Sequence, residues 1–275
     1  KNLETVMVGE ITGLEPEFPQ DTTPMLVVRG HDLRHRLLRG RQTKSFTEMK
    51  DSEIVSQIAN GHGLNPKVED TKVKLDYVLQ HNQTDWEFVQ ERAARLGYEV
   101  AVDNKTLYFR PPDNGEKKLF TITYGDDLQD FLPRLSTVNQ VSEVKVKGWL
   151  PSTKKEIEAT AGAGKAGNKM GGSTSGAEVV KKAFGKSSET KVNLVASGKA
   201  EADLMSEGML RVGLLDFITG EGTCKGYPNL RAGKVLEIAG VGKKFGGLYY
   251  LMTVEHSYSA TDGYQTSFTV RRNAT

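Results

Sequence analysis

The stretch Gly263-Tyr264-Gln265-Thr266-Ser267-Phe268-Thr269-Val270-Arg271-Arg272 decides the fold class of the C-terminal part of the chain. Large side chains alternate with polar ones, and this period of two is typical of a strand with one buried and one wet face. Asp262-Gly263 supplies a turn back to a second strand over residues 248–256. Glycines punctuate residues 213–272 at short intervals, which is typical of a small β-barrel or sandwich. They include Gly220, Gly222, Gly226, Gly233, Gly240, Gly242, Gly246, Gly247 and Gly263.

A glycine-rich segment precedes this region. Residues 160–176 hold six glycines, and Met170 is their one apolar side chain larger than Ala. Such a composition buries too little apolar surface to offset the entropy of ordering the chain. We therefore predict a Gly-rich linker or loop over residues 160–189. A barrel follows over residues 190–275, in which residues 199–212 begin as a helix or a strand.

Residues 46–115 carry the signals of a small α+β domain. One helix opens at Asp51-Ser52-Glu53 and ends at Gly61 or Gly63. A second helix opens with the capping box Thr84-Asp85-Trp86-Glu87 and ends at Gly97, after which residues 98–109 form a hairpin. The apolar residues that share one face in each helix are Ile54, Val55, Ile58 and Ala59, and Phe88, Val89, Ala93 and Leu96.

The flanking segments, residues 1–45 and 116–159, are predicted to be β-rich. Strands are expected at residues 6–8, 24–28, 118–124 and 138–149. Asp32 is expected to cap a short helix that carries Leu33, Leu37 and Leu38. A basic stretch surrounds this helix, with Arg29, Arg34, Arg36, Arg39, Arg41, Lys44, His31 and His35.

Composition excludes several classes of protein. The 275 residues include 37 Lys and Arg against 35 Asp and Glu, so the net charge of +2 lacks the basic field of a non-specific nucleic-acid binder. A single cysteine, Cys224, cannot form an internal disulfide or a thiolate zinc site. No apolar run is long enough to span a membrane. The first residues lack an initiator Met and the apolar core of a signal peptide, so we expect a fragment of a protein made in the cytoplasm.

Two glycine-containing strings match phosphate-binding patterns only superficially. Gly162-Ala163-Gly164-Lys165-Ala166-Gly167 matches the dinucleotide fingerprint, but Lys154-Lys155-Glu156 precedes it where a hydrophobic strand is required. Gly185-Lys186-Ser187 resembles the end of a phosphate-binding loop, but Val180 stands where the loop needs glycine. We expect no cofactor at either string.

The remaining polar side chains suggest no assembled catalytic or metal site. His31 and His35 are four residues apart but lack a third ligand, and His62, His81 and His256 lie in no recognisable triad pattern. Cys224 is more consistent with a small, half-buried strand residue than with a mildly activated thiol. Asp126, Asp127 and Asp130 could pair as in a glycosidase, but acids at the start of a helix are the simpler explanation. We predict neither catalytic nor metal-binding residues.

A series of motifs resembles the phage late-control D and VgrG-type hub family, and it covers most of the chain. In the N-terminal half the motifs are Val8-Gly9-Glu10-Ile11-Thr12-Gly13, Leu26-Val27-Val28-Arg29-Gly30-His31-Asp32, Asp51-Ser52-Glu53-Ile54-Val55, and Gln80-His81-Asn82-Gln83-Thr84-Asp85-Trp86-Glu87-Phe88 followed by Gly97-Tyr98. In the C-terminal half they are Gly222-Thr223-Cys224-Lys225-Gly226-Tyr227-Pro228-Asn229-Leu230-Arg231-Ala232-Gly233, Phe245-Gly246-Gly247-Leu248-Tyr249-Tyr250 and Val254-Glu255-His256-Ser257-Tyr258.

The resemblance implies an α+β, β-rich fold in which small β-barrel tube domains flank an inserted helix-plus-hairpin domain. On this basis residues 1–45 are the C-terminal part of a first tube domain, residues 46–115 the α+β domain, residues 116–159 a β-rich connecting domain and residues 190–275 the second tube domain. Residues 160–189 are then an inserted linker or loop.

The resemblance also implies a structural function. Family members form a trimeric central hub, in which three pairs of tube domains make a pseudo-sixfold ring between a hexameric inner tube and a trimeric spike. The implied partners are two further copies of the chain, the inner tube protein, the spike protein and other baseplate proteins, with no nucleic acid. The implied location is a phage tail, an extracellular injection particle or a secretion-system baseplate.

Two other classes of function stay open from the residues alone. A tail-associated cell-wall hydrolase would use Asp126, Asp127 and Asp130. A nucleic-acid-contacting protein would use the basic stretch from Arg29 to Lys44, although that stretch lacks interleaved aromatic residues.

Overall fold

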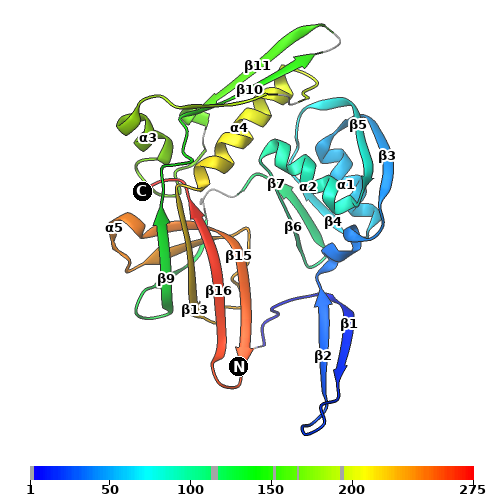
Figure 1. Cartoon of the computed structure of the whole chain (residues 1–275), viewed down its shortest axis with the longest axis vertical. Helices are drawn as coiled ribbons and strands as arrows, with labels where there is room; N and C mark the ends of the chain where they lie inside the picture. Colours follow the sequence, from blue (N-terminus) through cyan, green and yellow to red (C-terminus); the bar gives the residue numbers. More distant parts are fainter. Residues whose placement is uncertain (1–2, 113–116, 151–152, 166, 193–194) are drawn as a thin grey trace. The chain divides into compact units, whose positions relative to one another are not determined.

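The computed structural model describes residues 3–112, 117–150, 153–165, 167–192 and 195–275. The fold is α+β and β-rich, as predicted, and the chain divides into two compact units (Figure 1). Unit 1 comprises Lys1–Ala94 and Glu99–Arg110, and unit 2 comprises Arg95–Tyr98 and Pro111–Thr275. None of the helices within the described ranges has the length and hydropathy that a membrane-spanning helix needs.

Most of unit 1 is the predicted helix-plus-hairpin structure. Strands β3 (Gln42–Lys50) and β5 (Lys74–Gln83) form an antiparallel pair, and β4 (Asn65–Val68), β7 (Thr106–Arg110) and β6 (Glu99–Asp103) form a second sheet. Helices α1 (Asp51–Gly61) and α2 (Asp85–Leu96) supply the expected apolar faces, because Ile54, Val55 and Val89 are fully buried.

The capping box of α2 is confirmed. The Thr84 hydroxyl accepts a hydrogen bond from the Glu87 amide at 3.1 Å, and the Glu87 carboxylate accepts one from the Thr84 amide at 3.0 Å. These reciprocal bonds satisfy amides that the first helical turn leaves without partners. Gly97 has the positive φ of +61° expected at the end of the helix.

The N-terminal part of unit 1 is a two-stranded hairpin of β1 (Glu10–Glu17) and β2 (Met25–His31), followed by the short 3₁₀ helix η1 (Leu33–Leu38) (Figure 1). The cap predicted at Asp32 is confirmed, since its carboxylate accepts a hydrogen bond from the Arg34 amide at 2.9 Å. The strand predicted at residues 6–8 is wrong. The first strand begins at Glu10, where it pairs with His31 of β2.

Unit 2 is built around a large curled sheet. Its strands are β8 (Lys118–Thr123), β14 (Val235–Ala239), β15 (Gly247–Ser259), β16 (Gly263–Arg272), β13 (Ile218–Lys225) and β9 (Leu128–Leu135), in that spatial order. The alternation predicted for β16 is confirmed, because Thr266, Phe268 and Val270 are buried while the residues between them are partly exposed. The sheet curls into half a barrel.

The curl follows from the chain path through the two edge strands. β8 pairs with β14 in parallel and β9 pairs with β13 in antiparallel fashion, so β8 and β9 run in the same direction. Residues 124–127 alone connect them. The continuous segment from β8 to β9 therefore hydrogen-bonds to β14 on one side of the sheet and to β13 on the other. This connection draws the two edges of the sheet toward each other.

This pairing corrects two predictions. Residues 116–159 do not form a separate connecting domain, because β8 and β9 belong to the same sheet as the C-terminal strands. Asp126 and Asp130 do not begin a helix, because Leu128–Leu135 is a strand. The apolar spacing of Leu128, Phe131 and Leu132 suits a helix, but pairing with β13 decides the conformation.

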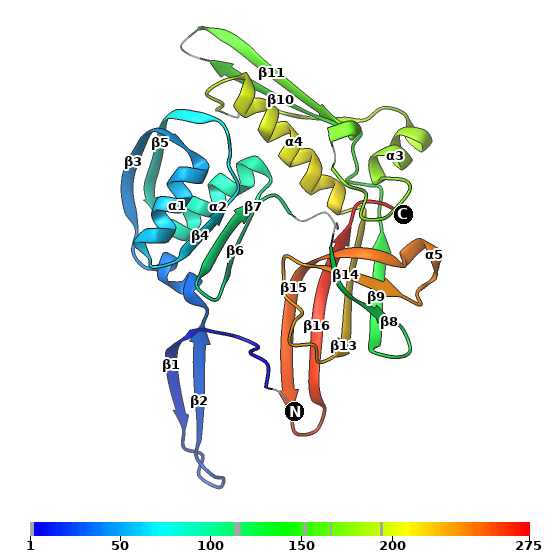
Figure 2. The same cartoon turned by 180° about the vertical axis from the view of Figure 1, so that it is seen from behind.

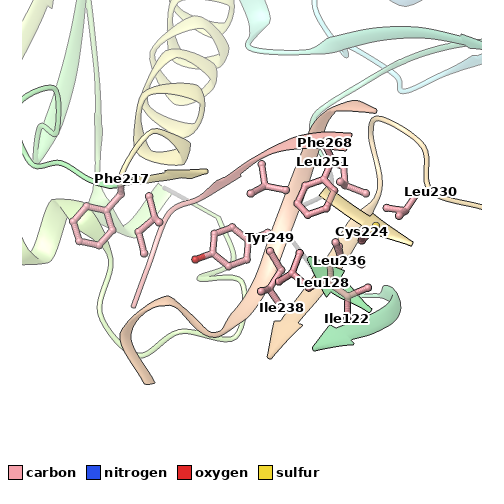
Figure 3. Close-up of a cluster of buried hydrophobic side chains, with 12 residues drawn as sticks. Ile122, Leu128, Phe217, Cys224, Leu230, Leu236, Ile238, Tyr249, Leu251 and Phe268 are labelled. Carbon is pink, nitrogen blue, oxygen red and sulfur yellow. The ribbon is translucent and has the colours of Figure 1, made fainter. Parts of the chain in front are cut away.

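The concave side of the large sheet holds the main core of unit 2 (Figure 3). Tyr249 is fully buried, and its hydroxyl donates to the Phe245 carbonyl oxygen at 2.6 Å. Phe131 meets the Tyr249 ring edge-on, with ring centres 5.6 Å apart. The other fully or almost fully buried members are Ile122, Leu128, Phe217, Ile218, Cys224, Leu230, Leu236, Ile238, Leu251, Phe268 and Val270.

A smaller sheet of β11 (Lys155–Gly162), β10 (Glu143–Leu150) and β12 (Ser188–Lys191) packs on helix α4 (Lys199–Leu215), which runs along it (Figure 2). Val144 and Val146 from the sheet meet Met205, Leu210 and Leu214 from the helix. The segment predicted as a helix or strand from residue 199 is therefore a helix. The short elements η2 (Ala163–Lys165) and α5 (Gly242–Phe245) complete unit 2, apart from α3.

The predicted linker over residues 160–189 is wrong in most of its length. Gly176–Phe184 forms helix α3, whose Ala177 is fully buried, and β12 begins at Ser188. Residues 167–175, which we name the glycine strap, are held by the end of β16 and the residues after it. The Ser173 amide donates to the Thr275 carbonyl oxygen at 2.8 Å, and the Gly176 amide donates to that of Asn273 at 3.0 Å. Position 166 lies outside the described residues.

Met170 anchors the glycine strap. Its side chain is fully buried in a cluster with Leu215, Val235 and Tyr250. Glycine is required at Gly172 because a β-carbon there would lie 2.8 Å from that of Ala274. The glycines of this segment thus permit close approach of two chain segments and do not mark flexibility.

Candidate assembly interface

The β1–β2 hairpin carries a surface that the rest of the described chain leaves uncovered. Within the described residues, β1 and β2 pair only with each other. Isolated two-stranded hairpins are marginally stable in water and usually gain stability from further strands or a packed face. The hairpin is therefore a candidate surface for binding another protein.

Cross-strand register divides the hairpin into two faces. Leu14 lies opposite Val28 and Pro16 opposite Leu26, and Ile11 lies opposite Gly30. Residues directly opposite each other share a face, as do residues two apart along a strand. We name this side the apolar hairpin face: Ile11, Leu14, Pro16, Leu26 and Val28.

The apolar hairpin face is open to solvent. Ile11 is 70% exposed, Leu14 62%, Leu26 57% and Val28 51%. Nearby Phe18, just beyond β1, is 78% exposed. Single exposed apolar residues are common, but a contiguous group on one side of a sheet is typical of a surface that binds another protein.

The opposite side, the charged hairpin face, holds Glu10, Glu15, Glu17, Arg29 and His31, together with the apolar Met25 and Val27 near the hairpin loop. The Arg29 guanidinium binds the Glu15 carboxylate through two hydrogen bonds of 2.7 and 2.9 Å. The His31 ring nitrogen lies 2.6 Å from the Thr12 hydroxyl. Arg29 and His31 are thus paired with side chains of β1.

Glu10 ties the hairpin to η1. Its carboxylate accepts hydrogen bonds from Arg36 and lies 2.5 Å from the His35 ring nitrogen. The Arg36 and His35 hydrogen bonds lower the pKa of Glu10 to about 2. A carboxylate held ionised at the base of β1 fixes the direction in which the hairpin leaves η1.

A second candidate surface is the convex side of the large sheet in unit 2, which we name the polar sheet face. One cross-strand row aligns Thr253, Thr269, Glu221 and Leu132, and the next aligns Glu255, Ser267, Thr223 and Asp130. The Thr253 and Thr269 hydroxyls lie 2.7 Å apart. Because most of these side chains are short and polar or are exposed carboxylates, this face is hydrated.

The basic stretch expected as a possible nucleic-acid contact is largely neutralised by neighbouring carboxylates. Arg29 binds Glu15 and Arg36 binds Glu10, as described above. Arg41 binds Glu87 at 2.8 Å, and Arg34 lies over the Trp86 ring at 5.3 Å, with Asp32 3.7 Å away. Cations paired in this way release fewer counterions on contact with phosphate.

The structure places the histidines in separate surroundings. The His31 and His35 ring centres are 6.4 Å apart, and each ring bonds a different partner. His62 lies 2.7 Å from the Asp85 carboxylate, and His81 is exposed. Among the described residues, no group of three or more His, Cys, Asp or Glu side chains is arranged to hold a metal ion.

His256 belongs to a partly buried polar cluster in unit 2. Its Nδ1 lies 3.0 Å from the Tyr264 hydroxyl and 3.1 Å from that of Thr266, and its Nε2 lies 3.0 Å from the Leu230 carbonyl oxygen. Burial lowers the pKa of His256, and the Arg231 guanidinium adds to this effect. The ring is therefore a neutral structural group at pH 7.

Cys224 is fully buried rather than half-buried, and it is not activated. Burial raises the pKa of its thiol to about 12, with further contributions from the negative charges of Asp127 and Asp130. Thiolate chemistry needs the opposite shift.

The three aspartates do not form a catalytic pair. Asp126 binds Lys225 at 3.3 Å, and Asp127 accepts a hydrogen bond from the Tyr227 hydroxyl at 2.8 Å. Although burial raises it, the pKa of Asp127 lies below its usual value because Thr123 and Tyr227 donate hydrogen bonds to the carboxylate. A glycosidase acid needs a raised pKa, and Asp130 lies exposed on the polar sheet face.

The two glycine strings serve structural roles. Gly162 ends β11, and the residues after it form η2, whose Lys165 binds Glu207 of α4 at 2.8 Å. The nucleotide fingerprint would need a helix directly at this point. Gly185 ends α3, and Lys186 binds Glu143 at 2.8 Å.

Surface depressions in the described chain are shallow. One of about 590 Å³ lies beside α1 and is lined mainly by Ser52, Ser56, Gln57 and Asn60. Two others, of about 460 and 290 Å³, lie on the polar sheet face. None of the three brings together a nucleophile, a base and its orienting group.

The model of the family described as the Alg8 N-terminal domain matches residues 1–260. The chain belongs to this Alg8 N-terminal domain family. The Alg8 description itself states neither an activity nor an assembly. Among curated proteins, none matches the sequence.

Solved structures share the fold. A tail protein from Neisseria meningitidis superposes with a TM-score of 0.71 at 16% identity, over 97% of this chain and 80% of its own. A 43 kDa prophage tail protein from Shewanella oneidensis gives 0.69 at 14% identity, over 97% and 78%. A component of the Escherichia coli type VI secretion system, described as structurally similar to the T4 tail proteins gp27 and gp5, gives 0.61 at 14% identity, over 97% and 60%.

Of the two hairpin strands, β2 overlaps the strand expected at residues 24–28, whereas β1 lies outside the strand expected at residues 6–8, and the two faces were not predicted. The signal for two faces in β1 is the alternation of Leu14 and Pro16 with Glu15 and Glu17. Leu26 and Val28 give the matching apolar positions in β2. The extra residue at Thr12, where the register shifts, obscures this period upstream.

Proposed function

We propose that this chain is a non-enzymatic structural component of a tail or injection-system baseplate, and that it acts as the central hub. In this role a homotrimer couples a hexameric inner tube to a trimeric spike. The observation that carries the proposal is the fold, which a tail protein and a prophage tail protein share over 97% of the chain.

The uncovered hairpin supports an assembly role. A protein that acts alone in solution gains nothing from a contiguous apolar face at half to two thirds exposure. A subunit of a larger ring gains binding energy from it. The described residues offer no catalytic constellation that competes with this interpretation.

The domain roles form part of the same proposal. The curled sheet of unit 2, with β8 and β9 included, is the second tube domain, and the β1–β2 hairpin belongs to the first. The polar sheet face then suits a hydrated wall of the ring. The motif series that resembles late-control D and VgrG-type hubs supports this assignment over both halves of the chain.

The particle partners follow from the hub role. The inner tube protein meets one end of the ring, the spike protein the other, and further baseplate proteins surround it. The chain is then assembled into a phage tail, an extracellular injection particle or a secretion-system baseplate. Closed rotational symmetry allows three copies to present repeated contacts to both neighbours.

The oligomeric state tests the proposal. We expect mass photometry of the purified chain to show trimers whose fraction rises with concentration, and electron microscopy to show rings. Only monomers across the micromolar range would contradict the hub role.

A further inference from the structure

The two strands of the hairpin carry opposite charge. β1 contains Glu10, Glu15 and Glu17 and no cation, whereas β2 contains Arg29 and His31 and no acid. All five side chains lie on the charged hairpin face. One edge of the hairpin is therefore acidic and the other is basic.

Both edges are available for pairing. Within the described residues, neither β1 nor β2 has a second neighbouring strand. Free strand edges present backbone amide and carbonyl groups that readily pair with another chain. Pairing β1 with the β1 of a second copy would place glutamates beside glutamates, which disfavours that arrangement.

Pairing β2 of one copy with β1 of the next has the opposite effect. It brings Arg29 of one copy beside the acidic strand of its neighbour. It also continues the apolar hairpin face from one copy to the next. Such head-to-tail contacts close into a ring when the rotation permits.

We propose that the hairpins of three copies join edge to edge, β2 of one copy beside β1 of the next, in a closed up-and-down barrel. The apolar hairpin face points inward and the charged hairpin face outward. Closure pairs every edge and buries Leu14, Leu26 and Val28 in one step. This inference rests on the proposed trimer and names the surface through which the copies meet.

Disulfide formation between copies tests the arrangement directly. Glu17→Cys places a thiol on β1 and Met25→Cys places one on β2, both at exposed positions. The native Cys224 is buried and stays unreactive. Each variant is oxidised alone and after co-expression with the other, and the pair Glu17→Cys with Val27→Cys covers a register shifted by two residues.

We expect the co-expressed pair to yield about tenfold more covalent dimer than either variant alone, because only the β2–β1 contact brings the two thiols within bonding reach. Thr261→Cys, in the β15–β16 turn of unit 2, is the control and should remain uncrosslinked. Efficient crosslinking of a single variant would overturn the head-to-tail order.

A further outcome separates this inference from the hub proposal. Trimers by mass photometry without any hairpin crosslink would mean that another surface holds the copies together and that the hairpin is covered by something else. The hub would then stand and the hairpin barrel would fail. Absence of trimers would contradict both.

Discussion

At the scale of single residues, the burial of Cys224 determines its chemistry. Since burial raises the pKa of its thiol to about 12, from 9.0 for the group in water, the thiolate fraction at pH 8 falls roughly a thousandfold. We expect native protein to react very slowly with a thiol reagent and denatured protein to react at the ordinary rate. Rapid labelling of the folded chain would show that the thiol is accessible.

Glu10 gives a second prediction, on pH. Its pKa is lowered to about 2 by Arg36 and His35, from 4.5 in the unfolded chain, so the unfolded state binds the proton more readily. The attachment of β1 to η1 is therefore fully stabilised above about pH 4.5, and this stabilisation is lost as the pH falls toward 2. A carboxyl titration followed by NMR should place the Glu10 midpoint near 2.

The variant Glu10→Gln separates this effect from general acid unfolding. It should increase amide exchange in β1 and β2 at pH 7 while exchange in the strands of unit 2 stays unchanged. Glu4→Gln, at an exposed position before the hairpin, is the matched control. Equal exchange in both variants would mean that Glu10 does not hold the hairpin.

At the scale of elements, the start of α3 is a site of tight packing. A β-carbon at Gly176 would lie 2.4 Å from Gln140 Oε1 and 2.7 Å from Phe217 Cγ. We expect Gly176→Ala to lower the free energy of unfolding by roughly 1–3 kcal/mol, because the ring of Phe217 must move. Gly164→Ala has open space around the new atom and should have little effect. Chemical denaturation measures both, and equal midpoints would contradict the packing argument.

The apolar hairpin face gives a prediction that distinguishes an interface from a core. Leu14→Glu combined with Val28→Glu should abolish self-association, because the new carboxylates would be buried beside each other in the assembled state. The thermal midpoint of the dilute monomer should hardly change, since both side chains are at least half exposed. A large loss of monomer stability would mean that the face already packs on its own chain.

Local signals predicted the elements that local interactions specify. The capping box at Thr84 and the cap at Asp32 lie within three residues of their partners, so sequence alone located both helices. β9 and the glycine strap depend on residues about 80 to 100 positions away, in β13 and at Asn273–Thr275. No local pattern encodes such pairing, and the composition of the strap resembled that of a linker.

The candidate interface was predictable only in part. The alternation of Leu14, Glu15, Pro16 and Glu17 indicated a strand with two unlike faces. The exposure of the apolar face could not be predicted, because an alternating strand normally buries that side in its own core. Sequence likewise showed the basic stretch, but the carboxylates that neutralise it come from residues 10, 15 and 87.

At the scale of the whole molecule, charge pairing predicts how the chain responds to nucleic acid. Four of the five arginines of the basic stretch, all except Arg39, already bind a carboxylate or lie over an aromatic ring, and the net charge is only +2. We expect no gel shift of duplex or single-stranded DNA at 50 mM salt, a condition that favours phosphate binding. A shift that weakens steeply with added salt would restore the nucleic-acid alternative.

The path of β8 and β9 has a consequence during synthesis on the ribosome. The strand that closes the large sheet emerges first, and its partners β13 to β16 follow after at least 80 further residues. At cellular elongation rates of 5–20 residues per second, Ile122 and Leu128 wait roughly 5–25 s for the chain that will cover them. During this interval the nascent protein exposes apolar side chains and unpaired strand edges. The yield of folded subunit should therefore depend on the supply of chaperones that bind such segments.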